Sequence, residues 1–496
     1  HRDLHSFPTR RSSDLFLHNN DERPLEGQLP ERGVIEAKGW KDDVYETADS
    51  EQAQKYLEKY KLVLVTNYRE FLLLGIDNNK KKVVLEFISI AQSADLFRAL
   101  FEHPQKAAVE AGDRLVDFLR RVMLYTAPLD KPQDLAWFLA SHAREARHRI
   151  DGTPNLPELD NLRKALENAL GMKFTGDDGE HFFRATLVQT LFYGVFSAWV
   201  LWSREKPKPD ERFNRRVAGW MLHVPMIGDL YTRIATPKSL KTLGLDEVLD
   251  RAEAILNRVD RIEFFKHFEE EHAVQYFYEP FLRAYDPVLR KDLGVWYTPP
   301  EIVQYQVERV DRVLREELDI TDGLADNRVV VLDPCCGTGA YLVETLRRIH
   351  RTLLEKGDDA LIAQRLKKAA LERIIGFEIL PAPFVIAHLQ IGLMLRKIGA
   401  PLLEENERAG VFLTNALTGW EKIPTPNDDT YFSPEFEKER EAADHVKRDT
   451  PILVVIGNPP YNAFAGTSPV EEAGLVEPYK EDRKSTRLNS SHRIRT

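Results

Sequence analysis

The chain has 496 residues, of which 43% are hydrophobic and 30% charged, and its formal net charge is -10. These values exclude a disordered chain, a collagen and a small disulfide scaffold, and they allow roughly two to four globular domains. The acidic total argues weakly against nucleic acid as a partner, and the two adjacent cysteines, Cys335 and Cys336, exclude a disulfide framework and favour the cytoplasm.

Both ends of the sequence look like translated sequencing adapters. The segments concerned are 1–15, which contains His5-Ser-Phe-Pro-Thr-Arg-Arg-Ser-Ser-Asp-Leu15, and 484–496, which begins Lys484-Ser-Thr-Arg-Leu-Asn-Ser-Ser-His492. Such segments are excluded from fold reasoning. We therefore expect the genuine chain to run from 16 to 483 and to be truncated at both ends.

Residues 16–90 alternate short apolar segments with one polar helix, which predicts a small α/β domain. In the expected strand at 33–38, Glu36 and Lys38 share one face because strand side chains alternate. Gln52 and Tyr56 are spaced i, i+4 on the helix expected at 50–59. A carboxylate and an ammonium at this spacing could bind Mg²⁺ and a scissile phosphate, whereas an exposed ion pair is the plainer alternative.

Residues 91–290 lose the strand pattern, and their apolar residues recur at helical spacing. This predicts a helical connector domain. The apolar stretch 185–202 is about long enough to span a bilayer, but it contains Gln189, Thr190 and Ser197. We expect a helix buried in the protein and no membrane partner.

After residue 290 the alternation of strands and helices resumes. The segments 329–332 and 452–456 are continuous apolar runs, which are typical of strands buried on both faces of a parallel sheet. The expected fold class is α/β, with a doubly wound, Rossmann-like sheet.

The sharpest motif is Asp333-Pro-Cys-Cys-Gly-Thr-Gly339, which lies between the first of these strands and a helix. Gly337 and Gly339 would let a ligand approach the backbone at a helix N-terminus, so a nucleotide-like ligand is favoured over a merely structural turn. The third glycine of a dinucleotide loop is absent, and Asp333 would suit a cationic ligand. S-adenosylmethionine, with its ammonium and sulfonium groups, meets both conditions.

A second carboxylate, Glu378, ends the strand expected at 373–377. This placement suits a side chain that binds ribose hydroxyls. The alternative is a carboxylate that only stabilises the N-terminus of the helix that begins near Pro381.

A third strand end carries Asn458-Pro-Pro-Tyr461. The side-chain oxygen of Asn458 and the backbone carbonyl of Pro459, kept out of a helix by Pro460, could accept both hydrogens of an exocyclic amine. Tyr461 could stack on a base flipped from a duplex. The alternative for this motif alone is a rigid loop.

In this order the three motifs resemble motifs I, II and IV of DNA methyltransferases that act on adenine N-6. Gly294-Val-Trp-Tyr-Thr-Pro-Pro-Glu-Ile-Val303 resembles their motif X, and motif X before motif I is the gamma-class arrangement. The resemblance implies that Tyr297, Thr298 and Pro299 lie over the methionine end of S-adenosylmethionine, and that Asn415 contacts its adenine. It further implies direct methyl transfer to double-stranded DNA. Methyltransferases acting on glutamine amides share the Asn458–Tyr461 pattern and are the alternative.

Glu36-Ala-Lys38, Gln52 and Tyr56, with paired strands, resemble the PD-(D/E)xK nuclease fold of restriction enzymes. The resemblance implies a Mg²⁺-dependent endonuclease in which Glu36 is a metal ligand and an upstream aspartate, Asp14 or Asp21, is another. The whole order resembles single-chain restriction-modification enzymes of types IIG and ISP. A methyltransferase with a vestigial nuclease and a non-catalytic DNA-binding subunit are the alternatives.

The expected organisation follows from these motifs. It comprises an artefact at 1–15, a nuclease-like domain at 16–90, a helical connector at 91–290, a methyltransferase domain at 291–483 and an artefact at 484–496. The missing C-terminal part would hold the target-recognition domain, so neither the recognition sequence nor the oligomeric state follows from the sequence.

Overall fold

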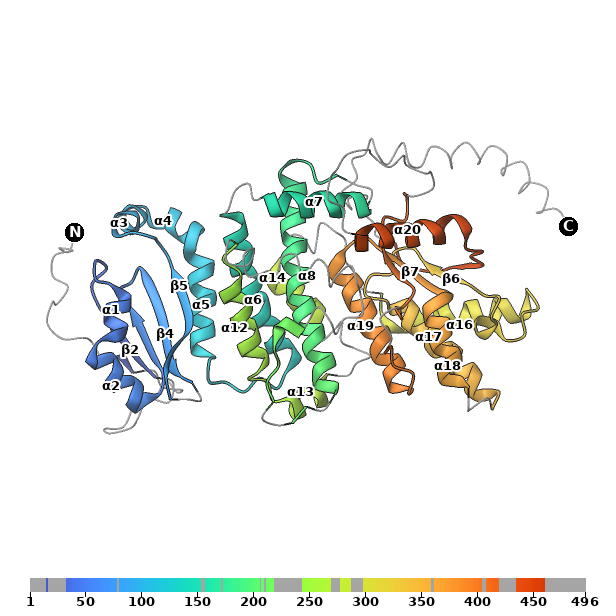
Figure 1. Cartoon of the computed structure of the whole chain (residues 1–496), viewed down its shortest axis with the longest axis horizontal. Helices are drawn as coiled ribbons and strands as arrows, with labels where there is room; N and C mark the ends of the chain where they lie inside the picture. Colours follow the sequence, from blue (N-terminus) through green and yellow to red (C-terminus); the bar gives the residue numbers. More distant parts are fainter. Residues whose placement is uncertain are drawn as a thin grey trace. The chain divides into compact units, whose positions relative to one another are not determined.

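The computed structural model divides the chain into two compact units, His1–Pro128 and Leu129–Thr496 (Figure 1). The structure describes residues 15–16, 33–77, 80–152, 157–170, 173–205, 207–208, 211–217, 243–268, 277–286, 298–357, 361–403, 407–418 and 434–459.

The first unit is built on a sheet of order β1-β2-β3-β4-β5. β2 and β3 pair in parallel and the other neighbours are antiparallel. In β1, Leu15 pairs with Ile35 although it falls in the segment expected to be an adapter. The strands are β1 (Leu15–Phe16), β2 (Val34–Ala37), β3 (Val63–Thr66), β4 (Glu70–Ile76) and β5 (Lys82–Ser89). The strands and helix expected between 33 and 74 are confirmed, and β5 was not foreseen.

Helices cover both faces of this sheet. On one face α1 (Val44–Asp49) and α2 (Glu51–Tyr60) pack on Val63, Val65 and Leu72. On the other face α5 (Asp113–Met123) packs through Phe118 and Val122. Preceding α5 are α3 (Ala94–Glu102), α4 (Pro104–Ala107) and the π-helical turn η1 (Ala108–Gly112).

The sequence assigned residues 91–123 to the connector, but α5 completes the core of the first unit. Phe118 and Val122 form one cluster with Leu64, Leu73 and Ile88, so the apolar stripe of this helix is buried on the sheet. A buried ion pair adds to this contact: Arg121 Nε lies 3.1 Å from Glu86 Oε2, and both side chains are 3% exposed.

The second unit begins with helices that share an aromatic core. α6 (Pro132–Asp151) packs against α8 (Gly176–Arg204), α12 (Asp246–Leu256) and α14 (Glu279–Tyr285). The remaining elements are α7 (Pro157–Leu170), η2 (Arg215–Val217) and α13 (Arg261–His267). Within the described residues, α8 is the one helix long and apolar enough to cross a membrane, and 89% of its apolar window is buried. The expectation of a buried helix is confirmed.

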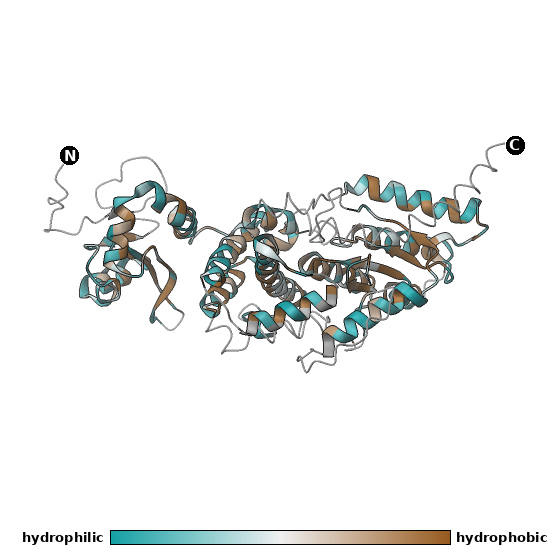
Figure 2. Ribbon diagram, turned by 90° about the horizontal axis from the view of Figure 1, so that it is seen from above, coloured by the Kyte–Doolittle hydropathy of each residue, from teal (hydrophilic) through white to brown (hydrophobic). Residues whose placement is uncertain are grey.

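A parallel sheet of order β8-β7-β6-β9 follows. α20 (Pro434–Asp449) packs on one face through Val446, beside Leu332 and Phe377. α17 (Ala340–Glu355) meets the other face, where Leu342 contacts Gly376 (Figure 1). Figure 2 shows that the sheet strands are hydrophobic, whereas the helices around them carry hydrophilic residues. This confirms the Rossmann-like α/β class.

The sheet and its helices have the following bounds. The strands are β6 (Val331–Asp333), β7 (Ile374–Glu378), β8 (Val411–Leu413) and β9 (Val454–Val455). The helices are α16 (Pro300–Glu316), η5 (Gly323–Ala325), α17 (Ala340–Glu355), α18 (Ile362–Glu372), α19 (Pro381–Lys397) and α20 (Pro434–Asp449).

The expectation that 452–456 is buried on both faces is wrong. β9 is the edge strand of the described sheet, and Val455 is 66% exposed. An apolar run alone does not distinguish a central strand from an edge strand that lacks a covering layer.

Replacing Arg121 by methionine is expected to lower the free energy of unfolding of the first unit by about 3–5 kcal/mol, because it breaks a buried ion pair by removing one of its two charges. Urea unfolding followed by hydrogen exchange of peptides from β4 and β5 reports this unit separately. Lys55→Met, in an exposed ion pair with Glu51, is the control and should change the value by less than about 0.5 kcal/mol. Equal effects of the two substitutions would contradict a stabilising role for the buried pair.

Candidate functional site

Asp333 ends β6 in the interior of the second unit. Its side chain is fully buried, and Oδ1 accepts a hydrogen bond from the Cys335 amide at 3.1 Å. Oδ2 is buried and has no hydrogen-bond partner among the described residues. Burial, with a smaller contribution from Glu378, raises the pKa of Asp333 to about 7, although the Cys335 bond opposes the shift. A buried carboxylate oxygen without a partner is a ready acceptor for a cationic ligand.

The two glycines of the Asp333–Gly339 loop have different roles. Both have positive φ, 55° at Gly337 and 89° at Gly339. A Cβ on Gly337 would meet no atom within 4 Å, so this backbone borders open space. A Cβ on Gly339 would lie 3.2 Å from Ala387 Cβ. Gly337 therefore fits the predicted approach of a ligand, whereas Gly339 is needed for close packing of α17 on α19.

Glu378 ends β7 beside this loop. Its Oε2 accepts from Gly337 N at 2.8 Å, and its Oε1 accepts from Ile379 N at 2.9 Å and Leu380 N at 2.7 Å. Burial raises its pKa to about 7, while these three hydrogen bonds lower it. The carboxylate thus joins the Asp333–Gly339 loop to the two residues that precede α19. Neither Ile379 nor Leu380 belongs to the first turn of α19, so these bonds leave the helix-stabilising alternative a prediction. A carboxylate has about four acceptor positions, so a ribose hydroxyl can still bind it.

Asn458 meets Thr298 across 160 residues of sequence. Asn458 Nδ2 donates to Thr298 Oγ1 at 3.0 Å. Pro299, the N-cap residue of α16, follows Thr298, and Pro459 is exposed. The structure thus joins a residue of the Gly294–Val303 motif to a residue of the Asn458–Tyr461 motif. Tyr297, Pro460 and Tyr461 lie outside the described residues.

The Asn458 loop also lies against Asp333. A Cβ on Gly457 would fall 2.4 Å from Asp333 Oδ1, so only glycine fits beside the carboxylate as placed. Asp333 and Glu378 end β6 and β7, and Asn458 follows β9, so all three lie at the carboxyl ends of three neighbouring parallel strands.

Asn415 follows β8, but its side-chain oxygen stabilises its own turn by accepting from Leu417 N at 3.0 Å. Its backbone carbonyl accepts from Lys447 Nζ at 2.9 Å. Sequence reasoning missed Lys447, whose side chain is 1% exposed. The available signal was helical spacing, because Lys447 lies four residues after the buried Ala443 on α20.

The four residues singled out in the first unit come together. Glu36 is buried, its Oε1 lies 2.8 Å from Lys38 Nζ, and its Oε2 accepts from Gln52 Nε2 at 3.1 Å. Gln52 Nε2 also donates to Tyr56 Oη at 2.9 Å. The ion pair of the plainer alternative is present, although Glu36 is buried rather than exposed.

A magnesium site is not complete among these residues. The described part of the chain contains no group of three or more His, Cys, Asp or Glu side chains that could hold a metal ion. Asp14 and Asp21 lie outside the described residues. Among Glu36, Lys38, Gln52 and Tyr56, Glu36 is the one residue with a carboxylate that could bind the metal.

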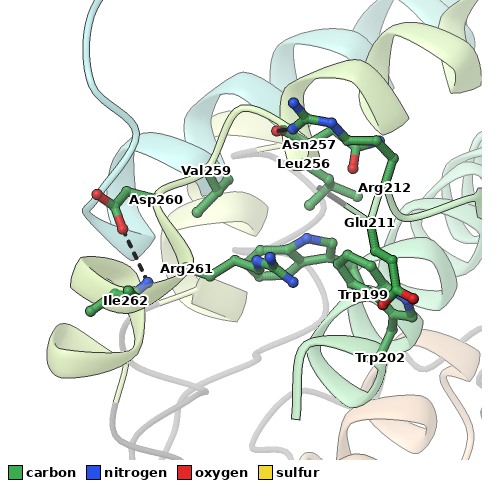
Figure 3. Close-up of a pocket in the computed structure, with 10 residues that line it drawn as sticks. All are labelled: Trp199, Trp202, Glu211, Arg212, Leu256, Asn257, Val259, Asp260, Arg261 and Ile262. Atoms are coloured by element: carbon green, nitrogen blue, oxygen red, sulfur yellow. Dashed lines mark hydrogen bonds between the residues drawn. The ribbon is translucent and has the colours of Figure 1, made fainter. Parts of the chain in front are cut away.

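A cavity of about 210 Å³ lies between α8, α12 and α13 (Figure 3). The Arg261 guanidinium lies 5.0 Å from the centroid of the Trp202 ring. The lining residues are Trp199, Trp202, Glu211, Arg212, Leu256, Asn257, Val259, Asp260, Arg261 and Ile262. The cavity is lined by none of the residues that the motifs identified.

Solved structures similar to this chain include restriction-modification enzymes. The DrdV–DNA complex is 19% identical over 87% of this chain and 37% of its own, with a TM-score of 0.46. The ATP-dependent type ISP restriction-modification enzyme LlaBIII bound to DNA is 22% identical over 67% of this chain and 21% of its own, with a TM-score of 0.47. The type IIG restriction endonuclease BpuSI is 14% identical over 90% of this chain and 41% of its own, with a TM-score of 0.28. This chain thus spans less than half the length of each.

No curated protein matches the chain. Residues 269–474 match the model of the N-6 DNA Methylase family. The match begins before the boundary expected at 291 and includes α14, β6 to β9 and the three strand ends that carry Asp333, Glu378 and Asn458. Over residues 269–474 the chain is therefore similar to the N-6 DNA Methylase family, and this part contains the Rossmann-like sheet.

Proposed function

We propose that this chain transfers a methyl group from S-adenosylmethionine to adenine N-6 in double-stranded DNA, as part of a cytoplasmic restriction-modification enzyme. The observation that carries the proposal is the convergence of Asp333, Glu378 and Asn458 at one edge of a parallel sheet. Open α/β sheets bind their ligands at the carboxyl ends of the strands. The match of residues 269–474 supports the same reaction class.

The residues present fit the cofactor. The unpartnered Oδ2 of Asp333 can accept from its ammonium group, the space beside Gly337 can admit it, and Glu378 can accept from its ribose. When bound, S-adenosylmethionine would supply an electrophilic methyl group on a sulfonium. Thr298 and Pro299 border the Asn458 side of the site.

Asn458 and Pro459 would hold the target. Because Asn458 Nδ2 donates to Thr298, Oδ1 is the amide atom that accepts from the adenine amine. The Pro459 carbonyl accepts the second hydrogen, and Tyr461 stacks on the base. Holding the amine in line with the donor methyl can lower the barrier by about 7–11 kcal/mol. No covalent enzyme intermediate is required.

The cluster of Glu36, Lys38, Gln52 and Tyr56 favours a second activity, Mg²⁺-dependent DNA cleavage. In that reaction Lys38 would steady the scissile phosphate while Glu36 binds the metal with an upstream aspartate. A vestigial nuclease beside an active methyltransferase competes with this second activity. Methylation of a glutamine amide and a non-catalytic DNA-binding role compete with the proposed methyl transfer to adenine.

Asn458→Ala is expected to lower the rate of methyl transfer to DNA by about 10²–10³-fold, the effect of losing one preorganised hydrogen-bond partner. Transfer of labelled methyl from S-adenosylmethionine, with detection of N-6-methyladenine, measures it. The exposed Glu355→Gln is the matched control. Unchanged methylation in Asn458→Ala would overturn the site, and label on a glutamine amide would favour the alternative substrate.

The affinity for S-adenosylmethionine is expected to rise as the pH increases to about 7. Above that pH the contribution of Asp333 to the affinity should become constant. The Asp333 carboxyl has a pKa of about 7, so it is neutral below that pH and attracts a cation only above it. Asp333→Asn should bind the cofactor more weakly at pH about 8 and vary less with pH, because one titrating carboxyl is lost. Calorimetric titration gives both values. Equal pH profiles for the two proteins would contradict the role of Asp333.

Lys38→Ala is expected to abolish any Mg²⁺-dependent cleavage of unmethylated plasmid DNA, because the ammonium beside Glu36 is lost. Lys55→Ala, an exposed lysine on α2, should cleave like the unchanged chain. Conversion of supercoiled to linear DNA is the measurement. Cleavage that survives Lys38→Ala would overturn the role of Lys38, whereas no cleavage by the unchanged chain would leave methyl transfer as the one proposed activity.

A further inference from the structure

Lys447 is a buried ammonium that the proposed reaction does not use. Its side chain is 1% exposed, and the nearest carboxylate oxygen among the described residues, Asp444 Oδ1, lies 3.9 Å away. Removing an ammonium from water is costly unless hydrogen bonds and counter-charges compensate. An apolar side chain of similar size could fill this buried position without that cost. The ammonium of Lys447 should therefore have a role beyond packing.

The closer partners of Lys447 belong to the chain that follows β8. Its Nζ donates to Thr414 Oγ1 at 2.7 Å and to the Asn415 carbonyl at 2.9 Å. The Asn415 carbonyl also accepts from Thr418 N at 3.2 Å. One ammonium therefore holds the first two residues of the turn that leaves the sheet at the proposed cofactor edge.

Lys447 is also connected to Glu378. Thr414 N donates to the Glu378 carbonyl at 2.8 Å, and Lys447 Nζ lies 5.5 Å from the centroid of the Phe377 ring, next to Glu378 in β7. α20, which carries Lys447, is the helix that precedes β9 and Asn458. The ammonium thus contacts the ends of β7 and β8 from the element that leads into β9.

We infer that Lys447 is a positioning residue for the adenosine end of the cofactor: it holds Thr414, Asn415 and, through Thr414, Glu378 in the arrangement that binds adenosine. The inference rests on the proposed function, because it assumes that the cofactor binds at this edge. Lys447 acts through these residues and does not itself react.

The charge of Lys447 can be removed by mild alkali. Burial lowers the pKa of Lys447 to about 8; Asp444 on the same helix opposes the shift and Arg440 adds to it. Its contacts on the β7 and β8 side are neutral: the Phe377 ring, the Thr414 hydroxyl and the Asn415 carbonyl. Below pH about 8 the ammonium donates to both acceptors, and above it the charge is lost.

The test compares S-adenosylmethionine binding to the full chain and to Lys447→Met by calorimetric titration. At pH about 7 the variant should bind about 10-fold more weakly, the effect of losing a charged hydrogen-bond donor. As the pH rises above about 8, the ratio of the two dissociation constants should fall towards one, because the unchanged chain loses the same charge. Titration of the cofactor's own amino group cancels in this ratio.

Lys438→Met, at an exposed position of α20, is the matched control and should bind as the unchanged chain does at every pH. A ratio for Lys447→Met that is one throughout, or that stays constant with pH, overturns the inference, since a lysine that only packs would show no such dependence. If Lys447→Met does not fold, Thr414→Val removes one acceptor of the ammonium, and its ratio should fall with pH in the same way. A constant ratio there also overturns the inference.

The role of Lys447 and the proposed function fail differently. Cofactor binding by the unchanged chain, with pH-independent ratios for the variants, overturns the role of Lys447 alone. Absence of cofactor binding by a folded, unchanged chain overturns the proposed function and this inference together.

Discussion

The parallel pairing of β6 with both β7 and β9 is the constraint on which the proposed methyl-transfer site depends. The registers Val331 with Ile374 and Val331 with Val454 bring the carboxyl ends of three strands to one edge. Asp333, Glu378 and Asn458 are far apart in sequence, and this pairing alone makes them neighbours. The same pairing places Gly457 against the Asp333 carboxylate, where any side chain would displace it.

This edge holds buried ionisable groups of both signs. Burial raises the pKa of Asp333 and Glu378 to about 7 and lowers the pKa of Lys447 to about 8, so in each case the charged form is disfavoured. An apolar edge would fold at lower free-energy cost, and a ligand that brings charge and hydrogen-bond donors offsets part of that cost. Cofactor binding should therefore also stabilise the folded second unit by mass action.

The first unit uses burial differently. Glu36 is fully buried, yet Lys38 and Gln52 contact its two carboxylate oxygens. A metal ion at Glu36 would have to compete with these donors. In the cluster of Glu36, Lys38, Gln52 and Tyr56, the Glu36 carboxylate is thus bound by Lys38 and Gln52. Tyr56 joins the cluster through its hydrogen bond with Gln52.

The sequence by itself determined the α/β class, the two carboxylates at strand ends, the Asn458 motif, and the pairs Glu36–Lys38 and Gln52–Tyr56. These rest on local patterns: an apolar strand followed by a glycine turn and a helix, alternation along one strand, and i, i+4 spacing on one helix face. Each of these patterns extends over only a few residues, so it can be recognised in the amino-acid sequence without knowledge of the tertiary contacts.

Only the tertiary structure decided which elements those residues meet. It placed α5 in the core of the first unit and made β9 the edge strand of the sheet that the structure describes. It also packed Gly339 against α19, joined Asn458 to Thr298, and buried Lys447 against the turn after β8. Each of these depends on contacts between segments distant in sequence. Periodicity shows that a face is apolar or that a turn is tight, but it does not identify the partner that covers the face or approaches the turn.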